Sequence, residues 1–295
     1  MLRDHERDTL QRFLFDHAPV RGEGVHLDTS WRVLSEHHGY PPVVRDLLGE
    51  MMAASALLAS TLKFDGRLTI QAQGDGHIPL IIMEATSERT LRGLAHWRDN
   101  VQPAPLAELL GKGYLAITIE PRQGRERYQG IVGIEGDTLA ECLQNYLLQS
   151  EQLDTHIWLA ADNYQAAGLL LQKMPEQDQV EDHDCWNRVV HLANTITPRE
   201  LLELPTAGIV HRLFHEEDVR LFDSLPISFR CSCSRERVAD MLRNFGIDEV
   251  HKLLDEQNTV EVTCEYCNQP YAFDRVDAEQ VFAAAHSPDT PPTQH

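Results

Sequence analysis

Apolar and polar residues alternate with the two-residue period of β-strands in several short runs between residues 67 and 172. Gly- and Asp-rich turns such as Gly74-Asp-Gly76 separate several of these runs, which favours antiparallel pairing of neighbouring strands. The predicted strands are 67–72, 78–84, 90–97, 114–120 and 128–134, followed by a hairpin of 155–161 with 166–172.

Two stretches near these strands have a helical period instead. Pro41 and Pro42 open a run to residue 63 in which apolar residues recur every three or four positions. A second helix is predicted from a cap at Asp137 or Thr138 to residue 148. Because these helices do not alternate regularly with strands, we predict an α+β fold with an N-terminal mixed sheet-and-helix core domain over residues 1–178.

The pattern changes after Met174, where residues 175–184 are polar and acidic and mark the start of a linker. Beyond it, short helical segments, one of them opened by a Thr-Pro-Arg-Glu capping box, are predicted at 186–193, 197–200 and 210–214. This part of the chain has many large apolar side chains but is too interrupted to form its own core, so it must lie against a neighbour. We therefore predict that residues 179–230 are a helical, metastable linker that is folded only while its neighbour is folded.

Residues 231–295 are predicted to form a small C-terminal module. Apolar residues mark one face of each of two short helices, around 238–245 and 250–254. Alternating residues then predict a hairpin with a Cys-x-x-Cys motif at its turn, and the Pro- and Thr-rich residues 287–295 are predicted to be disordered. So few apolar residues seldom hold a domain together without a metal or a disulfide.

Four of the six cysteines lie in this module, as the Cys-x-Cys pair Cys231 and Cys233 and the Cys-x-x-Cys pair Cys264 and Cys267. Four thiolates complete one tetrahedral metal site, and zinc is the metal that such closed sites usually hold. Iron–sulfur clusters are also ligated by cysteine, but we predict one zinc ion. A structural zinc contributes on the order of 10–16 kcal/mol to folding, so its loss is expected to unfold the module.

The spacing of these cysteines leaves a scaffold and a redox sensor equally open. Two cysteines one residue apart in an extended chain point to the same side, with Cα atoms near the upper distance limit for a disulfide. A disulfide between them would be strained and therefore labile, as regulatory disulfides are. Thiolates bound to a metal are already deprotonated, which makes them available to oxidants.

The net charge is −20, from 46 acidic and 26 basic residues, and no long segment is basic. Nucleic-acid binding needs positive charge, so we predict no nucleic-acid partner. A zinc-ribbon adaptor or nucleic-acid protein is therefore only the second choice of function, because the net negative charge of residues 231–295 counts against it. No apolar run is long enough to cross a bilayer, and the N-terminus lacks the apolar centre of a signal peptide. We therefore expect no membrane association and a cytoplasmic location, where cysteines are more often metal-binding than paired in structural disulfides.

Enzymatic functions fit the sequence less well. A thiol oxidoreductase would place its Cys-x-x-Cys in a thioredoxin-like βαβ unit, whereas Cys264 and Cys267 are predicted in a hairpin. A zinc enzyme keeps one coordination position open, and four thiolates would close it. Cys142, in a predicted amphipathic helix, is expected to be buried, and no role is assigned to it or to Cys185. We predict that the protein is not an enzyme.

Two segments of the module resemble a known family. Cys231-Ser-Cys-Ser-Arg-Glu-Arg-Val and Cys264-Glu-Tyr-Cys-Asn-Gln-Pro-Tyr-Ala-Phe are similar to the zinc module of the bacterial 33-kDa redox-regulated heat-shock chaperone (chaperonin) family. The resemblance extends to 11–15, 19–23 and 74–76 in the predicted core domain and to 214–219 in the predicted linker. It covers nearly the whole chain.

The resemblance implies a molecular chaperone that holds unfolding proteins without ATP under oxidative and heat stress. It implies an inactive form that is reduced and zinc-bound. It also implies an active form in which oxidation creates the disulfides Cys231–Cys233 and Cys264–Cys267, releases zinc, and unfolds the module and the linker. The oxidised form is expected to be a homodimer that binds unfolded or oxidatively damaged proteins.

Unfolding of the linker would expose apolar side chains, which are a surface that unfolded proteins can bind. The candidate client-binding residues are Val219, Leu221, Phe222, Leu225, Ile227 and Phe229.

Overall fold

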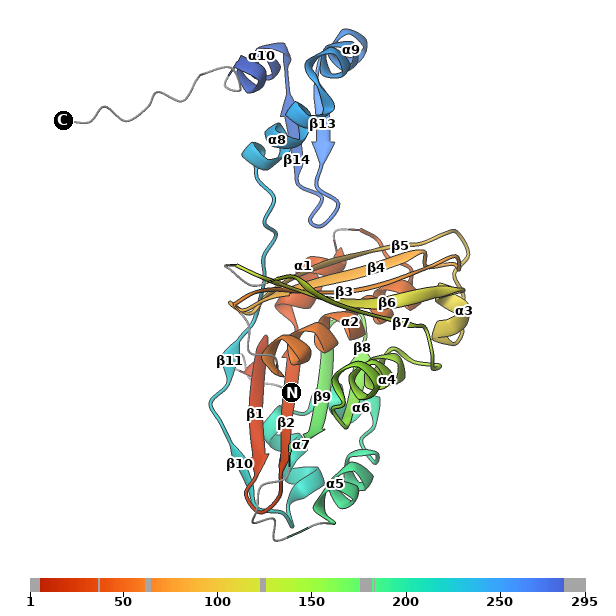
Figure 1. The fold of residues 1–295 in the computed structure, drawn as a ribbon, viewed down its shortest axis with the longest axis vertical. Coiled ribbons are helices and arrows are strands. Elements are labelled where there is room, and N and C mark those ends of the chain that lie inside the picture. Colours follow the sequence, from red (N-terminus) through yellow and green to blue (C-terminus); the bar gives the residue numbers. More distant parts are fainter. Residues whose placement is uncertain are drawn as a thin grey trace, which may run out of the picture. The chain divides into compact units, whose positions relative to one another are not determined.

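The computed structural model of the chain describes residues 6–36, 38–61, 65–122, 126–175, 182 and 184–283. The chain forms two compact units, Met1–Arg230 and Cys231–His295. Figure 1 shows helices and strands in both units, coloured from red to blue along the chain. The predicted α+β fold class is confirmed.

The first unit contains two sheets. The strands of one sheet are β1 (Thr9–Phe15), β2 (Val20–Leu27), β8 (Thr155–Ala161), β9 (Ala166–Lys173), β10 (Val219–Leu221) and β11 (Leu225–Pro226). Those of the other are β3 (Gly66–Gly74), β4 (Leu80–Thr86), β5 (Thr90–His96), β6 (Gly113–Pro121), β7 (Tyr128–Gly133) and β12 (Ser228–Phe229).

The strand order is β10-β1-β2-β9-β8 in the first sheet, with β11 also paired to β1, and β12-β5-β4-β3-β6-β7 in the second. All of these pairs are antiparallel except β12 with β5, which is parallel. The predicted hairpin of β8 with β9 and the predicted strands of the second sheet are therefore confirmed, with ends shifted by one or two residues.

A long apolar helix, α2 (Pro42–Thr61), lies between the two sheets and contacts strands of both (Figure 1). Most of its side chains from Val44 to Leu58 are buried around the whole helix, as expected for a helix in the centre of a core. Its predicted start at Pro42 is confirmed. The other helices of this part are α1 (Thr29–Glu36), α3 (Leu106–Leu110) and α4 (Leu139–Glu151), of which α4 starts with a capping box at Thr138.

The sheet of β1, β2, β8 and β9 is covered on its other face by three helices that follow in the chain. They are α5 (Cys185–Ala193), α6 (Pro198–Glu203) and α7 (Thr206–Phe214). Their apolar side chains join those of β1 and β9 in a second core, in which the rings of Phe13 and Phe15 have centroids 6.1 Å and 5.2 Å from that of Phe214. These helices thus lie against a neighbour, as their interrupted pattern predicts.

The predicted linker does not form a compact unit of its own in the described structure. Residues 184–230 belong with the first unit, and the boundary between units falls after Arg230. The linker also ends in the strands β10, β11 and β12, which the sequence pattern does not predict. Most of the acidic start of the linker, 176–181 and 183, lies outside the described residues, and the three-part division 1–178, 179–230 and 231–295 stays a prediction.

Strands β1 and β2 are absent from the predicted elements, and for β2 the structure gives a physical reason. β2 is buried along nearly its whole length, so it lacks polar–apolar alternation, and its two glycines resemble turn signals. Both glycines serve close packing instead: a side chain at Gly22 would collide with the ring of Phe13, and one at Gly24 would collide with Thr206.

The second unit is small. It contains α8 (Arg235–Phe245), α9 (Ile247–Gln257), the hairpin of β13 (Val260–Thr263) with β14 (Pro270–Phe273), and α10 (Arg275–Ala283). The two predicted helices and the hairpin are confirmed, whereas α10 was not predicted. Its buried apolar side chains are few: Val238, Ala239, Leu242, Val250, Leu254, Val260, Phe273 and Ala278. The predicted disordered tail, 287–295, lies outside the described residues.

A buried histidine holds the linker helices onto the first sheet. His26 of β2 is 3% exposed, and its Nε2 donates to the carbonyl oxygen of Leu201 in α6 at 2.9 Å. Burial disfavours the imidazolium and lowers the pKa of His26 to about 4, although the carbonyl oxygens of Leu201 and Leu204 partly oppose this. Because a histidine of the unfolded chain binds a proton more readily, this contribution to stability is complete above about pH 6.5 and is lost as the pH falls towards 4.

We expect His26→Gln to remove this pH dependence, because an amide in place of the imidazole can donate to Leu201 without titrating. The difference in free energy of unfolding between the wild type and the variant should fall by about 2 kcal/mol from about pH 7.5 to about pH 5. Urea unfolding followed by tryptophan fluorescence measures it. The free energies of unfolding of the wild type and the variant must be compared at each pH, because Glu23 and Glu50 also change the stability of both proteins. Burial raises the pKa values of these two carboxyl groups to about 7, so they stabilise the fold as the pH falls, opposite to His26.

His191→Gln, at an exposed position of α5, is the matched control and should leave the pH dependence as it is in the wild type. A constant difference between wild type and His26→Gln across this pH range would contradict the assigned role of His26.

Candidate metal centre

Two segments of the second unit bring four sulfur atoms together. Cys231 and Cys233 lie directly before α8, and Cys264 and Cys267 lie in the turn between β13 and β14. Their four Sγ atoms all lie within 4.8 Å of one another, with 3.7 Å between Cys231 and Cys264 and 3.4 Å between Cys233 and Cys267. All four residues are half-buried, and none forms a disulfide.

The backbone of the hairpin turn fixes the Cys-x-x-Cys pair. Asn268 N donates to Cys264 O at 2.8 Å, and Cys264 N donates to Gln269 O at 3.0 Å. Asn268 has a φ of 53°, in the left-handed region that asparagine adopts more easily than most residues. The turn therefore directs both sulfurs to the same side.

The Cys-x-Cys pair is fixed by the start of α8. Ser234 caps this helix by accepting from Arg237 N at 3.3 Å. The side chain of Arg237 folds back and donates to the carbonyl and hydroxyl oxygens of Ser232, each at 2.7 Å. Ser232, between the two cysteines, is thus held by the helix that follows it.

The four sulfurs fit a tetrahedral metal ion. Zinc–sulfur bonds of about 2.3 Å in a tetrahedron place sulfurs about 3.8 Å apart, close to the observed separations. Four thiolates leave no open coordination position, which is typical of a structural site and not of a catalytic one. The predicted ligands Cys231, Cys233, Cys264 and Cys267 are therefore found together in an arrangement that can hold a metal.

A tyrosine outside the four cysteines contacts the cluster. Tyr271 Oη donates to Cys233 Sγ at 3.2 Å. Burial opposes the thiolate of Cys233, but hydrogen bonds from Tyr271 and the neighbouring thiols outweigh it and lower the pKa of Cys233 to about 7. The same bond raises the pKa of Tyr271 to about 12. The sequence pattern places Tyr271 on a strand, but only the folded hairpin shows its contact with sulfur.

A second group of possible ligands is an ion-pair cluster. Ligand atoms of Asp182, Cys185 and Glu217 lie within 4.8 Å of one another. Arg188 already pairs with both carboxylates, at 2.6 Å from each, and so occupies the place of a cation. Burial raises the pKa of Cys185 to about 11, which keeps its thiol protonated. This cluster joins α5 to the segment after α7.

The remaining cysteine, Cys142, is buried in α4 as predicted. Its Sγ donates to the carbonyl oxygen of Glu135 at 3.0 Å, and burial raises its pKa to about 11.

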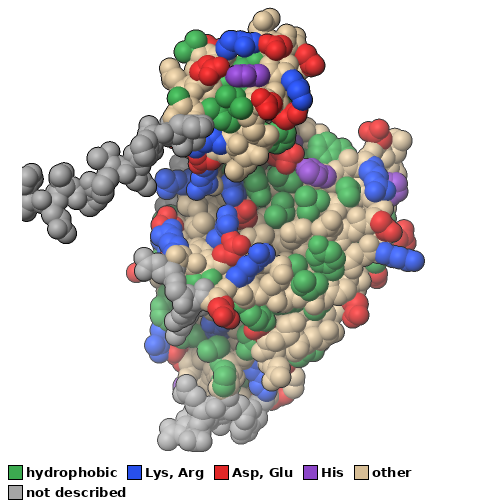
Figure 2. Space-filling view, turned by 45° about the horizontal axis from the view of Figure 1, so that its top comes forward, with side chains coloured by type: hydrophobic (Ala, Val, Ile, Leu, Met, Phe, Trp, Pro, Cys, Tyr) green, Lys and Arg blue, Asp and Glu red, His purple; other side chains and the backbone are tan. Residues whose placement is uncertain are grey.

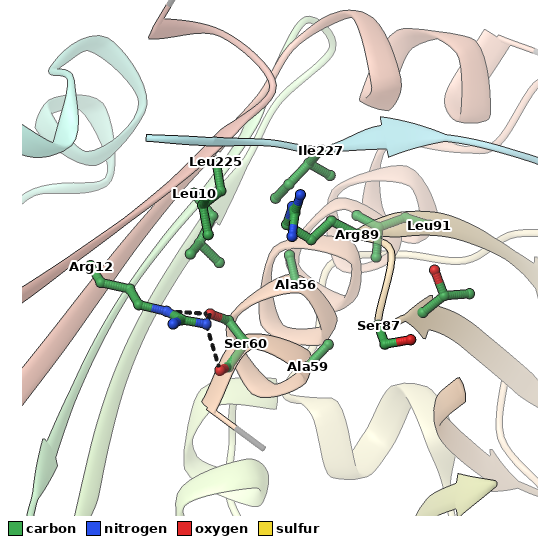
Figure 3. A pocket seen from close by; sticks show the side chains of 11 residues that line it. Leu10, Arg12, Ala56, Ala59, Ser60, Ser87, Arg89, Leu91, Leu225 and Ile227 are labelled. Atoms are coloured by element: carbon green, nitrogen blue, oxygen red, sulfur yellow. Dashed lines mark hydrogen bonds between the residues drawn. The ribbon is translucent and has the colours of Figure 1, made fainter. Parts of the chain in front are cut away.

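The six candidate client-binding residues lie in or next to the short strands that close the first unit. Leu221 and Phe222 are 38% and 42% exposed. Three others are packed. Val219 lies against the core under the linker helices, Ile227 lies in the core around α2, and Phe229 lies against that core. Leu225 and Ile227 line a cavity of about 130 Å³ between β1, α2 and the turn from β4 to β5 (Figure 3).

The charged surface matches the expectation from composition. On the face shown in Figure 2, Lys and Arg side chains are interspersed with Asp and Glu and do not form a continuous basic surface. Among the described residues, the helices are all too short or too polar to cross a bilayer.

Comparisons with known proteins agree with one another. The family model described as Hsp33 protein matches residues 8–274. The chain is 49% identical to a 33 kDa chaperonin of Methylobacillus flagellatus over 93% of this chain and 94% of that protein. It is 48% identical to a 33 kDa chaperonin of Nitrosococcus oceani over 99% of this chain and 100% of that protein. A crystal structure of 33 kDa chaperonin (heat shock protein 33 homolog) from Thermotoga maritima superposes with a TM-score of 0.80 and 21% sequence identity. The superposition covers 94% of this chain and 99% of that one, so the two proteins have the same fold.

Cys264→Ser is expected to remove most of the bound metal, because three thiolates and a hydroxyl form a much weaker tetrahedral site. The small core should then no longer hold the second unit, which limited proteolysis will detect. Cys142→Ala removes a thiol outside the cluster and should leave the metal content unchanged. Full metal content and an undiminished protease-resistant second unit in Cys264→Ser would refute the ligand assignment.

Tyr271→Phe is expected to weaken metal binding about tenfold, because it removes the hydroxyl that donates to a ligand sulfur. Titration with Co²⁺, followed by its thiolate absorption band, measures this affinity directly. Tyr164→Phe, at a position 68% exposed in the first unit, is the control. Equal affinities in the wild type and Tyr271→Phe would show that the hydrogen bond does not support the site.

Proposed function

The chain belongs to the Hsp33 family of 33 kDa chaperonins, and we propose that it is a redox-regulated, ATP-independent chaperone that holds unfolding proteins. The reduced, zinc-bound form is inactive in this proposal. Oxidation forms two disulfides, releases zinc, and unfolds the C-terminal module and the linker, residues 179–230. The exposed surfaces then bind unfolded or oxidatively damaged proteins and prevent their aggregation under oxidative and heat stress.

The observation that carries this proposal is the convergence of four reduced cysteines in a unit with very little apolar core. Zinc is the metal that suits four thiolates and one closed tetrahedral site. A zinc ion held by Cys231, Cys233, Cys264 and Cys267 would contribute most of the folding free energy of this unit. Its fold would therefore depend on the redox state of the four sulfurs.

Oxidation of each pair removes two electrons. One thiolate attacks peroxide and becomes a sulfenic acid, with the second peroxide oxygen leaving as water; the partner thiolate then displaces hydroxide to form the disulfide. The family resemblance implies the pairs Cys231–Cys233 and Cys264–Cys267. The sulfur–sulfur contacts of 3.7 Å and 3.4 Å in the structure, however, join Cys231 to Cys264 and Cys233 to Cys267, which belong to different pairs.

This difference supports a coupling of oxidation to unfolding. A disulfide from Cys231 to Cys264 would tie distant parts of the module together and preserve its fold, because long closed loops stabilise most. Disulfides between near neighbours in the sequence close very short loops and replace no such connection. Once zinc is released, the proposed pairing would leave the two segments unconnected.

The linker is the part that unfolding of the module would affect next. Val219, Leu221, Phe222, Leu225, Ile227 and Phe229 would all become available to clients in the proposed active form. We further propose that this form is a homodimer, that the protein is cytoplasmic and not an enzyme, and that it has no nucleic-acid or membrane partner. The mixed surface charge supports the absence of a nucleic-acid partner, and the free cysteines support the cytoplasmic location.

Light scattering of a thermally unfolding client protein tests the switch. We expect the reduced, zinc-loaded form to leave aggregation unchanged, and the peroxide-treated, zinc-free form to suppress most of it, because only the second exposes apolar surface. A Cys142→Ser/Cys185→Ser double variant should behave as the wild type, since its thiols lie outside the cluster. Equal suppression by both redox forms, or suppression by neither, would contradict the proposal.

A further inference from the structure

Residues 219–229 cover one edge of each sheet in the first unit. β10 and β11 pair with β1, and β12 pairs with β5. We propose that the edge of β1, with the cavity behind it, is a site where an extended segment of an unfolding protein adds as a β-strand after residues 219–229 have left. This inference rests on the proposed function and names the kind of contact that a client makes.

The backbone of β1 carries the bonds that such a strand would need. Phe222 N donates to Arg12 O at 2.9 Å, Asp16 N donates to Asp218 O at 2.9 Å, and Ile227 N donates to the oxygen of Asp8 at 2.8 Å. The backbone groups of Arg12 in β1, and of Asp8 and Asp16 directly before and after it, face away from β2. When the linker leaves, they become an open edge, which is a template for an added strand.

The linker holds this edge by short contacts that another strand can replace. β10 has three residues and β11 has two, whereas β1 pairs with β2 over six residue pairs. Asp223 and Ser224 between them are exposed and form no strand, and Pro226 has no amide hydrogen to donate. The pairing of residues 219–229 with the edge of β1 is thus interrupted between β10 and β11 and weakened at Pro226.

The cavity behind the edge of β1 determines which side chains an added strand can place there. Leu225 and Ile227 lie over it, and Leu10, Ala56 and Leu91 from three different elements form its apolar wall (Figure 3). Ile227 is only 6% exposed. Since alternate side chains of a strand point to the same face, a replacing segment needs apolar side chains two positions apart. Residues 219–229 therefore resemble the client segment that we propose: both are extended and have apolar residues at alternate positions.

One of two arginines at the same cavity favours a polypeptide backbone. Arg12 is held by Ser60 of α2, to which its Nε and Nη2 donate, whereas Arg89 Nε donates to the carbonyl oxygen of Pro226 at 3.1 Å. Removal of the linker leaves Arg89 without this acceptor, and the carbonyl oxygen of an incoming strand can replace it. The edge of β5 would also be uncovered, but residues 219–229 pair with it only through Ser228 and Phe229, whereas they pair with five residues of β1. We therefore assign the added strand to β1.

The test uses a fluorescein-labelled peptide with the sequence of residues 216–230, added to the full-length protein. Anisotropy should show binding to the oxidised, zinc-free form and none to the reduced, zinc-loaded form. A peptide N-methylated at the position of Phe222 loses the amide that donates to Arg12 and should bind about tenfold more weakly. N-methylation at the position of Leu221, whose amide points away from β1, is the matched control and should change affinity less than about twofold.

Competition with a client completes the test. The unfolding client of the light-scattering assay should displace the labelled peptide. The unlabelled peptide should in turn reduce the suppression of aggregation, whereas the peptide methylated at Phe222 should do so much less. Equal affinity of the two methylated peptides, or no peptide binding, would overturn strand addition. Binding without competition would show that this edge serves the linker of a second copy of the chain instead.

The same experiment separates the two proposals. If the oxidised protein suppresses aggregation but the peptides behave alike, the strand-addition site is wrong and the chaperone function stands. If the oxidised protein suppresses no aggregation, the proposed function fails whatever the peptides do.

Discussion

The convergence of four cysteine sulfurs is the constraint on which the second unit depends. The buried apolar side chains of this unit are few, and two of them, Ala239 and Ala278, are small. Cys231 and Cys233 come from the start of the unit and Cys264 and Cys267 from the turn between β13 and β14, so a shared metal would connect parts that the apolar core holds weakly. In small domains such a connection often decides whether the fold exists at all. In the proposed function, oxidation of these sulfurs would therefore decide whether the second unit is folded.

The first unit also contains a part that is held weakly, next to a core that is held strongly. The core around α2 is extensive and involves both sheets, whereas residues 219–229 are attached by strands of two or three residues. Phe229 pairs with β5, and Cys231 follows it by only two residues. This stretch is thus held by short strand pairs with both sheets, and its C-terminal end continues directly into the cysteine cluster. We infer that, in the proposed switch, unfolding of the second unit frees this C-terminal end, and that the short strands are the next part to open.

Local features of the sequence were sufficient to predict the grouping of the four cysteines, the hairpin with Cys264 and Cys267 at its turn, and the central helix. Each depends on spacing within a short segment: Cys264 and Cys267 in one turn, or the helical period after Pro42. β2 was not predicted because Gly22 and Gly24 resemble turn residues. Their role in the structure is to allow close packing against Phe13 and Thr206, which the local sequence does not show. The strands β10 to β12 and the bond from Tyr271 to Cys233 depend on partners distant in sequence, which no local pattern reveals. The candidate client-binding residues are apolar positions in the sequence, but the burial of Ile227 and the packing of Val219 and Phe229 depend on the two sheets that these residues close.

Hydrogen–deuterium exchange of residues 219–229 and of β1, compared between the metal-bound reduced form and the metal-free oxidised form, tests the central claim most directly. The account predicts that the amides of Phe222, Ile227 and Asp16 lose protection when the second unit unfolds, while those of α2 and of β3 with β6 keep theirs. Unchanged protection of residues 219–229 in a protein whose second unit is demonstrably unfolded would contradict it, because the cysteine cluster would then have no control over the linker.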